Sequence, residues 1–230
     1  RTISEEITIK FRKPRTLYVA QVKPRSGQEV IYDPRRDPDE LLAHPGRFPD
    51  FTVSLDIYGS YSTKDQHHPI SHIDFGYTIA VIRRMLAAAD GSPHGEVVQW
   101  LGQKTLKGKR VNHIRIEGGD APWRRVRARD DESVFAFADR VGSDAYVVFY
   151  NNPDIRKLTS ELDEDETYLV PPYYSPKLDL WFDEETGMLH SLEARDYQGR
   201  LYERFNYIKM VPNAPLTDRD FDPDNPDYDF

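Results

Sequence analysis

Three histidines, His67, His68 and His72, form the most site-like group in the sequence. A continuous helix would bring His68 and His72, four residues apart, to one face. Two such imidazoles are half of a tetrahedral zinc site. However, Pro69 lies between them, no glutamate completes an HExxH pattern, and no third ligand is recognisable. We therefore predict no metal, and favour a role for these histidines in a loop or a helix cap.

A run of arginines is a second candidate for chemistry. In the predicted strand WRRVRAR, Arg125, Arg127 and Arg129 share one face and Arg124 lies on the other. Such a ladder could meet phosphate, lipid head groups or an acidic protein partner. The alternative is a solvated face neutralised by the acidic residues at 130–132.

Aspartates crowd the stretch PLTDRDFDPDNPDYDF at the end of the sequence. Asp218, Asp220 and Asp222 alternate as the first ligands of an EF-hand calcium loop do, but Pro223 stands where that loop needs glycine. No glutamate occupies the last ligand position of such a loop. The pattern favours a helical turn capped by Thr217 or Asp218, followed by extended chain that its aromatic residues pin to the fold.

The sequence lacks the motifs of common enzyme classes. It has no GxSxG elbow, P-loop or GxGxxG fingerprint, and without cysteine it has no thiol nucleophile. Its 39 acidic residues offer too many pairings to select a catalytic carboxylate pair. We predict a non-enzymatic protein with no catalytic residue and no cofactor, and keep a hydrolase as the third alternative.

Composition limits the partners of the protein. A formal net charge of −8 disfavours nucleic acid and anionic membrane surfaces, because its long-range field repels phosphates. No apolar run approaches the roughly 20 residues that span a bilayer, so we expect no transmembrane segment. The 14 tyrosines and 11 phenylalanines favour a fold rich in β-sheet.

Alternating apolar and polar residues predict antiparallel strands along most of the chain. The alternation is clear in TISEEITIKFR at 2–12 and continues as a meander of short strands to residue 59. The stretch DDESVFAFADRVG at 130–142 is ambiguous, although Val134, Phe137, Ala138 and Val141 fit a short helix. DAYVVFY at 144–150 predicts a strand because of its β-branched and aromatic residues.

A second run of strands is predicted at 177–210. It reads as three consecutive antiparallel strands joined by turns that contain Gly187 and Gly199. The first of these strands places three apolar residues on one face: Leu178, Leu180 and Phe182.

One long helix interrupts the strands. Pro69 suits its first turn, and Gly91 and Pro93 stop it. An apolar stripe at helical spacing is formed by Phe75, Ile79, Ile82 and Leu86. A second row beside it is formed by Ile73, Tyr77 and Val81, so the predicted buried sector is wide.

Several separated motifs match a known family. They are GQEVIYD at 27–33, LLAHPG at 41–46, VSLDIYGSYSTKDQHHPI at 53–70, LDLWFDEETGMLHSLEARDYQGRLYERFNYIKM at 178–210 and LTDRDFDPDNPDYDF at 216–230. On these motifs the sequence resembles the bacterial DUF1571 family, whose members look like relatives of the LolA/LolB lipoprotein carriers. The stretch 130–165 matches poorly and is expected to be an insertion.

The resemblance implies an α+β fold of LolA-like type, an incomplete antiparallel β-barrel whose strongly curved sheet wraps around one or more helices. We take residues 1–230 as a single domain of this type, and expect the family's first strand and long helix to lie upstream of residue 1. The resemblance further implies export to the bacterial cell envelope, in the periplasm or secreted. A membrane anchor, where present, would lie in the same upstream segment.

In carrier-like folds the sheet and its helix enclose a cavity for acyl chains. We therefore hypothesise a hydrophobic ligand, a lipid or an acylated peptide, bound between sheet and helix. Its walls would be the stripe residues Phe75, Ile79, Ile82 and Leu86 and the strand residues Leu178, Leu180 and Phe182. The alternative is that these residues form a dry core and that the protein is an envelope interaction module, docking a protein partner through strand edges or the arginines.

Overall fold

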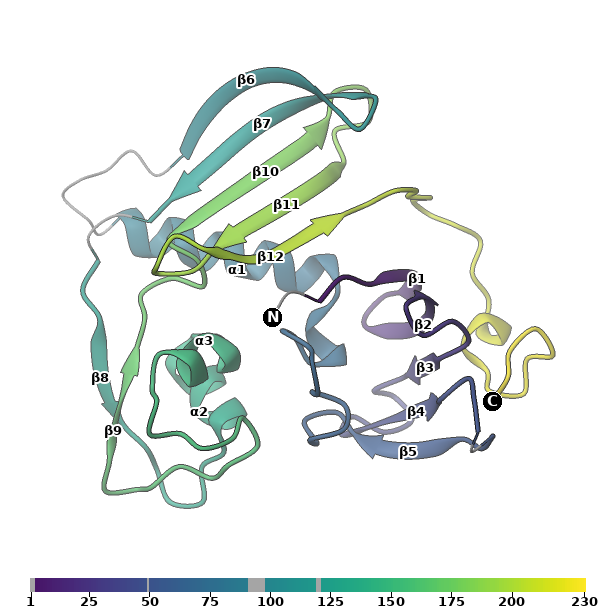
Figure 1. The fold of residues 1–230 in the computed structure, drawn as a ribbon, viewed down its shortest axis with the longest axis horizontal. Coiled ribbons are helices and arrows are strands. Elements are labelled where there is room, and N and C mark those ends of the chain that lie inside the picture. The colour runs from purple at the N-terminus through teal and green to yellow at the C-terminus, as the bar shows by residue number, and fades with distance from the viewer. Residues whose placement is uncertain (1–2, 49, 91–97, 119–120) are drawn as a thin grey trace. The chain divides into compact units, whose positions relative to one another are not determined.

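The structure is a computed structural model that describes residues 3–48, 50–90, 98–118 and 121–230 (Figure 1). The chain divides into two compact units, one made of Arg1–Thr78 with Asn213–Phe230 and the other of Ile79–Pro212. The single domain expected for 1–230 stays a prediction. The helix stop expected at Gly91 and Pro93 lies outside the described residues.

The first unit is built on a five-stranded antiparallel sheet in the order β1-β2-β3-β4-β5. Its strands are β1 (Glu6–Arg12), β2 (Thr16–Lys23), β3 (Glu29–Tyr32), β4 (Glu40–His44) and β5 (Val53–Asp56). Strands adjacent in sequence are adjacent in the sheet, as in a simple meander. The meander predicted for the start of the chain is therefore confirmed.

The second unit contains another five-stranded antiparallel sheet, in the order β12-β11-β10-β7-β6. Its strands are β6 (Val98–Leu106), β7 (Lys109–Glu117), β10 (Lys177–Asp183), β11 (Leu189–Arg195) and β12 (Leu201–Asn206). The three consecutive strands predicted at 177–210 are β10, β11 and β12. Gly187 ends the first turn with φ of 67°, a left-handed conformation that favours glycine.

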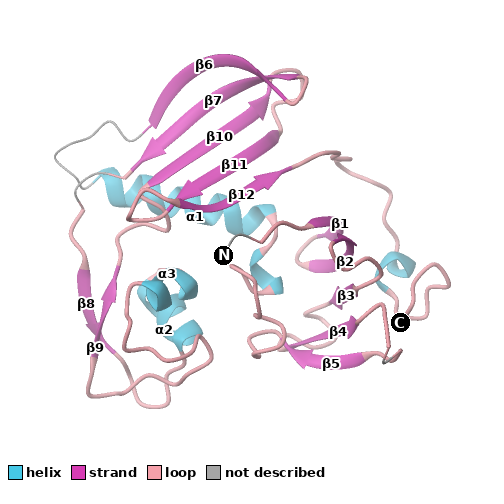
Figure 2. Ribbon diagram, viewed as in Figure 1, coloured by secondary structure: helices cyan, strands magenta, loops and turns pink. Residues whose placement is uncertain are grey.

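A two-stranded antiparallel sheet and two short helices complete the second unit. They are β8 (Arg124–Arg127), β9 (Thr167–Val170), α2 (Val134–Val141) and α3 (Ala145–Tyr150). Figure 2 shows that helices and strands coexist and that the sheets stay open, so the predicted α+β class is confirmed. In the part of the chain that the structure describes, no helix combines the length and the apolar character needed to cross a membrane.

The strand predicted at 144–150 was wrong, because this segment is helix α3. The Asp144 carboxylate accepts hydrogen bonds from the N–H groups of Tyr146 (2.9 Å) and Val147 (3.1 Å) and so caps the helix. Burial of four successive residues, 145–148, also suits a helix packed against α2 better than an alternating strand. Cap and packing outweigh the strand preference of the β-branched residues.

The long helix is α1 (Phe75–Asp90), and it begins six residues later than Pro69. A short 3-10 turn, η1 (Ile70–His72), comes before it. Asp74 sets the start, because its Oδ1 accepts the N–H of Tyr77 at 2.8 Å and its Oδ2 accepts Nε of Arg15 at 3.2 Å. The capping carboxylate of Asp74, and not Pro69, thus sets the first residue of α1.

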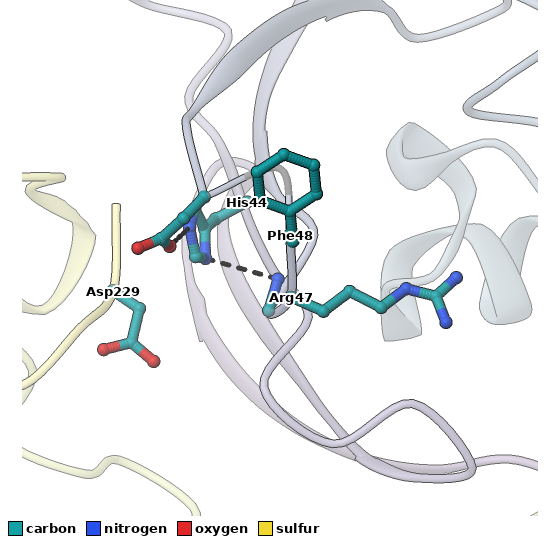
Figure 3. A pocket seen from close by; sticks show the side chains of 6 residues that line it. His44, Arg47, Phe48 and Asp229 are labelled. Atoms are coloured by element: carbon teal, nitrogen blue, oxygen red, sulfur yellow. Dashed lines mark hydrogen bonds and ion pairs between the residues drawn. The ribbon is translucent and has the colours of Figure 1, made fainter.

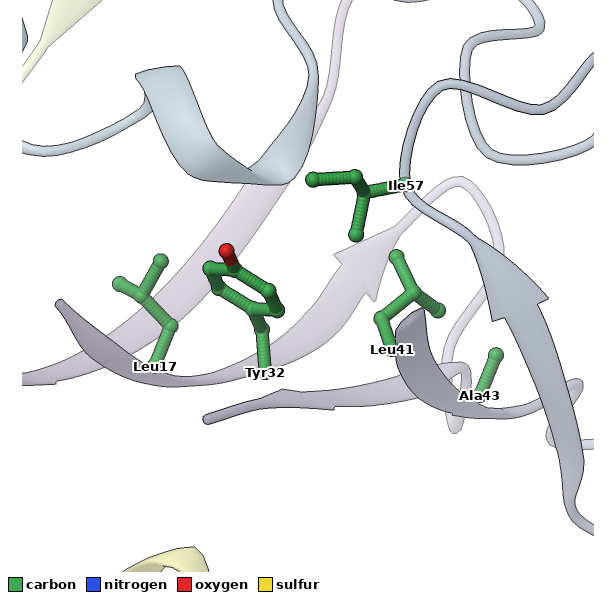
Figure 4. Close-up of a cluster of buried hydrophobic side chains, with 5 residues drawn as sticks. All are labelled: Leu17, Tyr32, Leu41, Ala43 and Ile57. Atoms are coloured by element: carbon green, nitrogen blue, oxygen red, sulfur yellow. The ribbon is translucent and has the colours of Figure 1, made fainter. Parts of the chain in front are cut away.

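The first unit has an apolar core on one face of its sheet (Figure 4). Leu17 on β2 is directly opposite Tyr32 on β3, and both are buried. The core cluster consists of Leu17, Tyr32, Leu41, Ala43 and Ile57. The Tyr32 hydroxyl donates to the carbonyl of Pro38 at 3.1 Å, so its polar end is also satisfied.

The opposite face of this sheet is covered by residues Asn213–Phe230, here called the acidic segment. Tyr18 and Ile31 on the sheet and Phe221 on the segment form a second buried cluster. Phe221 ends a 3-10 turn, η2 (Asp218–Phe221). The predicted capped turn followed by an aromatic-pinned tail is thus confirmed, with Thr217 as the cap.

Truncation of Leu17 to alanine should lower the free energy of unfolding by about 2–5 kcal/mol, because it leaves a cavity in a fully buried cluster. The matched control is Leu201→Ala on β12, where the side chain is exposed. Urea unfolding followed by circular dichroism measures both. Equal losses in the two variants would contradict the core assignment.

Acid should destabilise the acidic segment through Asp220. The hydrogen bond from Lys10, followed by that from the backbone of Thr217, lowers the pKa of Asp220 from 3.8 to about 2. Because the folded pKa is depressed, this stabilisation is present above pH 3.8 and is lost as pH falls towards 2. We expect Asp220→Asn to be less stable at neutral pH and to show a flatter stability profile in this window. Urea unfolding at several pH values, with Asp224→Asn as control, tests this; parallel profiles of Asp220→Asn and wild type would refute it.

Candidate functional site

The predicted helix stripe is largely accessible. Ile79 is 50% exposed, Phe75 is also exposed, and Ile82 and Leu86 are half-buried. The buried row of the helix is instead Tyr77, Val81 and Met85. The helix therefore uses the second row for packing. The wide buried sector predicted from both rows was wrong at Phe75 and Ile79, whose side chains are exposed.

The predicted strand residues lie on the apolar face of the second sheet. Leu178 and Leu180 are buried, Leu180 to 2% exposure, and Phe182 is half-buried. Strand pairing places Leu180 directly between Ile114 on β7 and Leu192 on β11. These two residues are in turn paired with apolar residues on the edge strands β6 and β12. The apolar row spans all five strands: Trp100, Ile114, Leu180, Leu192 and Phe205.

The apolar row is buried in its middle and exposed at its ends. Trp100 on β6 is 68% exposed and Phe205 on β12 is 39% exposed. Val98 on β6, two residues before Trp100, adds another exposed apolar side chain on this face. Isolated exposed apolar residues are common, but a row continuous with a buried floor is typical of a contact surface. We therefore regard this face as the candidate ligand-contact surface.

Sequence reasoning missed Trp100 and Phe205. The pattern of EVVQWLGQKTL at 96–106 predicts the strand that carries Trp100, but not its pairing, because a β-bulge between Trp100 and Gln103 shifts the register. Gly102, with φ of 90°, lies within this irregularity and is the only sequence signal that could have marked it.

The other face of the same sheet carries a polar network centred on Asp179. Its carboxylate accepts Nε2 of His113 at 2.6 Å and two nitrogens of Arg115 at 2.9 and 3.2 Å. Burial acts to raise the pKa of Asp179, but the hydrogen bonds from Arg115 and His113 hold it below its ordinary value. Trp181 stacks on His113 with ring centroids 4.8 Å apart, and Lys104 lies over the Trp181 ring. The His113–Asp179 pair is thus enclosed by partners, as a structural network is.

Conversion of Asp179 to asparagine should lower the free energy of unfolding by about 1–3 kcal/mol, since it leaves buried donors of His113 and Arg115 poorly matched. Glu185→Gln, on the exposed turn after β10, is the control and should change little. Thermal and urea unfolding measure the difference. A stable Asp179→Asn protein would show that the network contributes nothing to the fold.

The predicted histidine group packs around an aromatic ring. His72 stacks on Tyr77 at 4.2 Å, and His68 meets the same ring edge-on at 5.4 Å. Among the residues that the structure describes, no group of three or more histidine, aspartate or glutamate side chains is arranged to hold a metal ion. The geometry is that of a packed cluster at the start of α1.

The arginines of β8 bind the neighbouring polypeptide. Arg124 donates to the carbonyl of Val141 at 2.7 Å, and Arg127 donates to the carbonyl of Glu164 at 2.8 Å. Arg127 also forms an ion pair with Asp165. These contacts tie the β8 strand to the 130–165 stretch. Arg127, the one ladder residue among them, pairs with Asp165 and not with the acidic residues at 130–132. A role of the ladder in binding a partner stays a prediction.

A pocket of about 450 Å³ lies in the first unit (Figure 3). It is lined by His44, Gly46, Arg47, Phe48, Asp50 and Asp229. Nδ1 of His44 accepts the N–H of Gly46 at 3.4 Å, so Nε2 is the donor to Asp50 at 2.9 Å. With both ring nitrogens engaged, His44 is held in place and is not poised as a general base.

Two glycines fix the wall of this pocket. Gly46 has φ of 67°, and a Cβ added to it would lie 2.1 Å from the carbonyl carbon of Gly27. Only glycine tolerates so close a backbone approach. These glycines end and begin the motifs at 41–46 and 27–33, so two separate motifs meet at this wall.

Comparison with family models gives a match to DUF1571, "Protein of unknown function", over residues 2–131 and 150–230. The chain belongs to the DUF1571 family. The match omits 132–149, which contains α2 and most of α3 and lies inside the stretch expected to be an insertion. Comparison with curated proteins gives no match.

Three solved structures resemble this DUF1571 chain at low identity. A DUF1329 family protein from Desulfovibrio piger shares 8% identity with a TM-score of 0.31, over 89% of this chain and 63% of its own. A LolA superfamily protein from Nitrosomonas europaea shares 10% with a TM-score of 0.25, over 86% and 58%. A domain described as an outer membrane lipoprotein-sorting protein, from Vibrio parahaemolyticus, shares 11% with a TM-score of 0.29, over 86% and 58%. The chain spans about three fifths of these proteins, and we infer nothing about ligands from them.

Proposed function

We propose that the protein binds a hydrophobic ligand, a lipid or an acylated peptide, on the apolar face of its second sheet, and does so in the bacterial cell envelope without catalysing a reaction. The observation that carries this proposal is the apolar row, which crosses five strands and exposes Trp100 and Phe205 at its ends. The sequence motifs shared with DUF1571, a family whose members look like relatives of lipoprotein carriers, suggest the same class of ligand.

The proposed contact residues are those of the helix stripe, the strand and the ends of the row. Leu178 and Leu180 form a buried floor, while Ile79 and Trp100 offer surface that a ligand can cover. Ile79 onward belongs to the same compact unit as the sheet. The full set is Phe75, Ile79, Ile82, Leu86, Leu178, Leu180 and Phe182, with Trp100 and Phe205 added.

Burial of apolar surface suffices to drive such binding. Each methylene group removed from water contributes about 0.8 kcal/mol, from which the loss of translational freedom must be subtracted. Burial of about fifteen carbons contributes about 12 kcal/mol, and about 8 kcal/mol remains after subtraction of about 4 kcal/mol for lost freedom. An acyl chain of this length could therefore bind at about micromolar concentration with no specific polar contact. Such binding needs no polar group of the protein. The polar atoms of the His113–Asp179 and His44–Asp50 pairs are hydrogen-bonded to neighbouring residues.

Uptake of a fluorescent fatty acid should weaken at least about 10-fold in Ile79→Asp, because a carboxylate would be desolvated by the acyl chain. Trp100→Ser should weaken it by removing contact area. The control is Arg83→Asp, an exposed position on the same helix that leaves the stripe intact. Circular dichroism must show all three variants folded, and unchanged uptake by both Ile79→Asp and Trp100→Ser would sink the proposed surface.

Native mass spectrometry of protein purified from a bacterial envelope tests the function itself. A stoichiometric adduct that organic extraction identifies as a lipid or acyl group is the expected result. Protein without adduct that also fails to take up added fatty acid would overturn the proposal and leave an envelope interaction module as the better hypothesis.

A further inference from the structure

The acidic segment makes a dense set of contacts with one face of the first sheet. Tyr228 stacks on Tyr18 with ring centroids 4.0 Å apart and planes 10° from parallel. Phe221 is buried in the same cluster, and the guanidinium of Arg12 lies over its ring at 4.7 Å. Aromatic stacking and burial thus anchor both ends of the 218–230 stretch to the sheet.

Charge complementarity accompanies these aromatic contacts. Nζ of Lys10 donates to Asp220 Oδ1 at 2.7 Å and to the Tyr228 hydroxyl at 2.9 Å, and Arg12 pairs with Asp218 at 2.8 Å. The chain as a whole carries a formal charge of −8. Lys10 and Arg12 therefore make this face of the sheet locally basic in a protein whose net charge is negative.

The sheet also contacts the backbone of the segment. The buried carboxylate of Glu29 accepts the N–H of Asp229 at 2.9 Å and the hydroxyl of Tyr18 at 2.6 Å. Burial and the neighbouring Glu29 raise the pKa of Tyr18, which keeps its hydroxyl a donor. Stacking, ion pairing and a backbone hydrogen bond are the three contacts that a peptide-recognition site combines.

The segment is also ordered by its own hydrogen bonds. Asp220 Oδ2 accepts the N–H of Thr217 at 2.8 Å, and Asn225 donates from Nδ2 to the carbonyl of Arg219 at 2.8 Å. The Tyr228 hydroxyl donates to the carbonyl of Asp220 at 2.8 Å. These hydrogen bonds lie within residues 217–228, so the conformation of this stretch depends little on the chain before it.

An exposed connection joins the acidic segment to the rest of the protein. Residues 207–212 follow β12 without regular structure, and Ile208 is 75% exposed. They belong to the second unit, whereas the segment belongs to the first. A connection of this kind can change direction at little cost in buried surface.

We propose that the Tyr18 face of the first sheet is a recognition site for an acidic aromatic segment, and that it accepts this segment from a second copy of the chain as well as from its own. The contacts named above are the same whether the segment comes from the same copy or from a second copy. Exchange therefore loses only the interactions made by residues 207–212. The inference is independent of ligand binding by the second sheet.

A labelled synthetic peptide of residues 213–230 tests the recognition site. The receptor is the full-length chain carrying Asp220→Ala and Tyr228→Ala. In the wild-type chain the tethered segment competes with the peptide at an effective concentration of roughly millimolar, and the two substitutions weaken this competition. Fluorescence anisotropy should show peptide binding at least about 10-fold tighter than to the wild-type chain. Lys10→Met in that receptor should abolish the gain, whereas Asp224→Asn in the peptide should leave binding unchanged.

Energy transfer between full-length copies tests the exchange without weakening the segment. Because the chain contains no cysteine, a donor at Asp224→Cys of one copy and an acceptor at Arg36→Cys of another can be attached specifically. Mixing should give transfer that rises with protein concentration and is competed away by unlabelled peptide. A folded receptor that ignores the peptide would overturn the recognition site, and peptide binding without transfer between copies would overturn the second copy as its partner.

Discussion

Antiparallel register in the second sheet is the constraint on which the candidate site depends. Adjacent residues of β10 alternate between faces, so Leu178 and Leu180 face one side while Asp179 and Trp181 face the other. One strand thus supplies both the apolar floor and the centre of a buried ionic network. A register slip of one residue would exchange these faces, placing Asp179 among leucines, and the cost of burying that carboxylate without Arg115 opposes the slip.

Much of this fold could be predicted from residue patterns, and the failures have physical causes. The alternation at 177–210 and the helical spacing at 134–141 follow local preference, and the structure agrees with both. At 144–150 local composition favoured a strand, but the cap at Asp144 and packing against α2 produced a helix. Pattern alone therefore sufficed where tertiary contacts reinforced it and failed where they opposed it.

The candidate site was harder to predict than the elements that carry it. Helical spacing predicted that both apolar rows on α1 would be buried, but the structure buries Tyr77 and Met85 and leaves Ile79 exposed. A β-bulge between Trp100 and Gln103 shifts the pairing of β6, and sequence alternation does not predict such a shift. The place of Trp100 in the apolar row could therefore not be predicted. The contact between Gly27 and Gly46 likewise depends on two turns nineteen residues apart meeting in space, which neither turn reveals by itself.

Asp220 uses both of its carboxylate oxygens, one to cap the short turn η2 and the other to hold Lys10 on the sheet. Local folding of the turn and its attachment to the sheet therefore share a single group. Half-formed intermediates, with the turn folded but detached or attached but unfolded, would each leave one oxygen without its protein partner. The segment should consequently order and release in one cooperative step, so that its opening exposes the whole stretch at once to any protease that samples the chain.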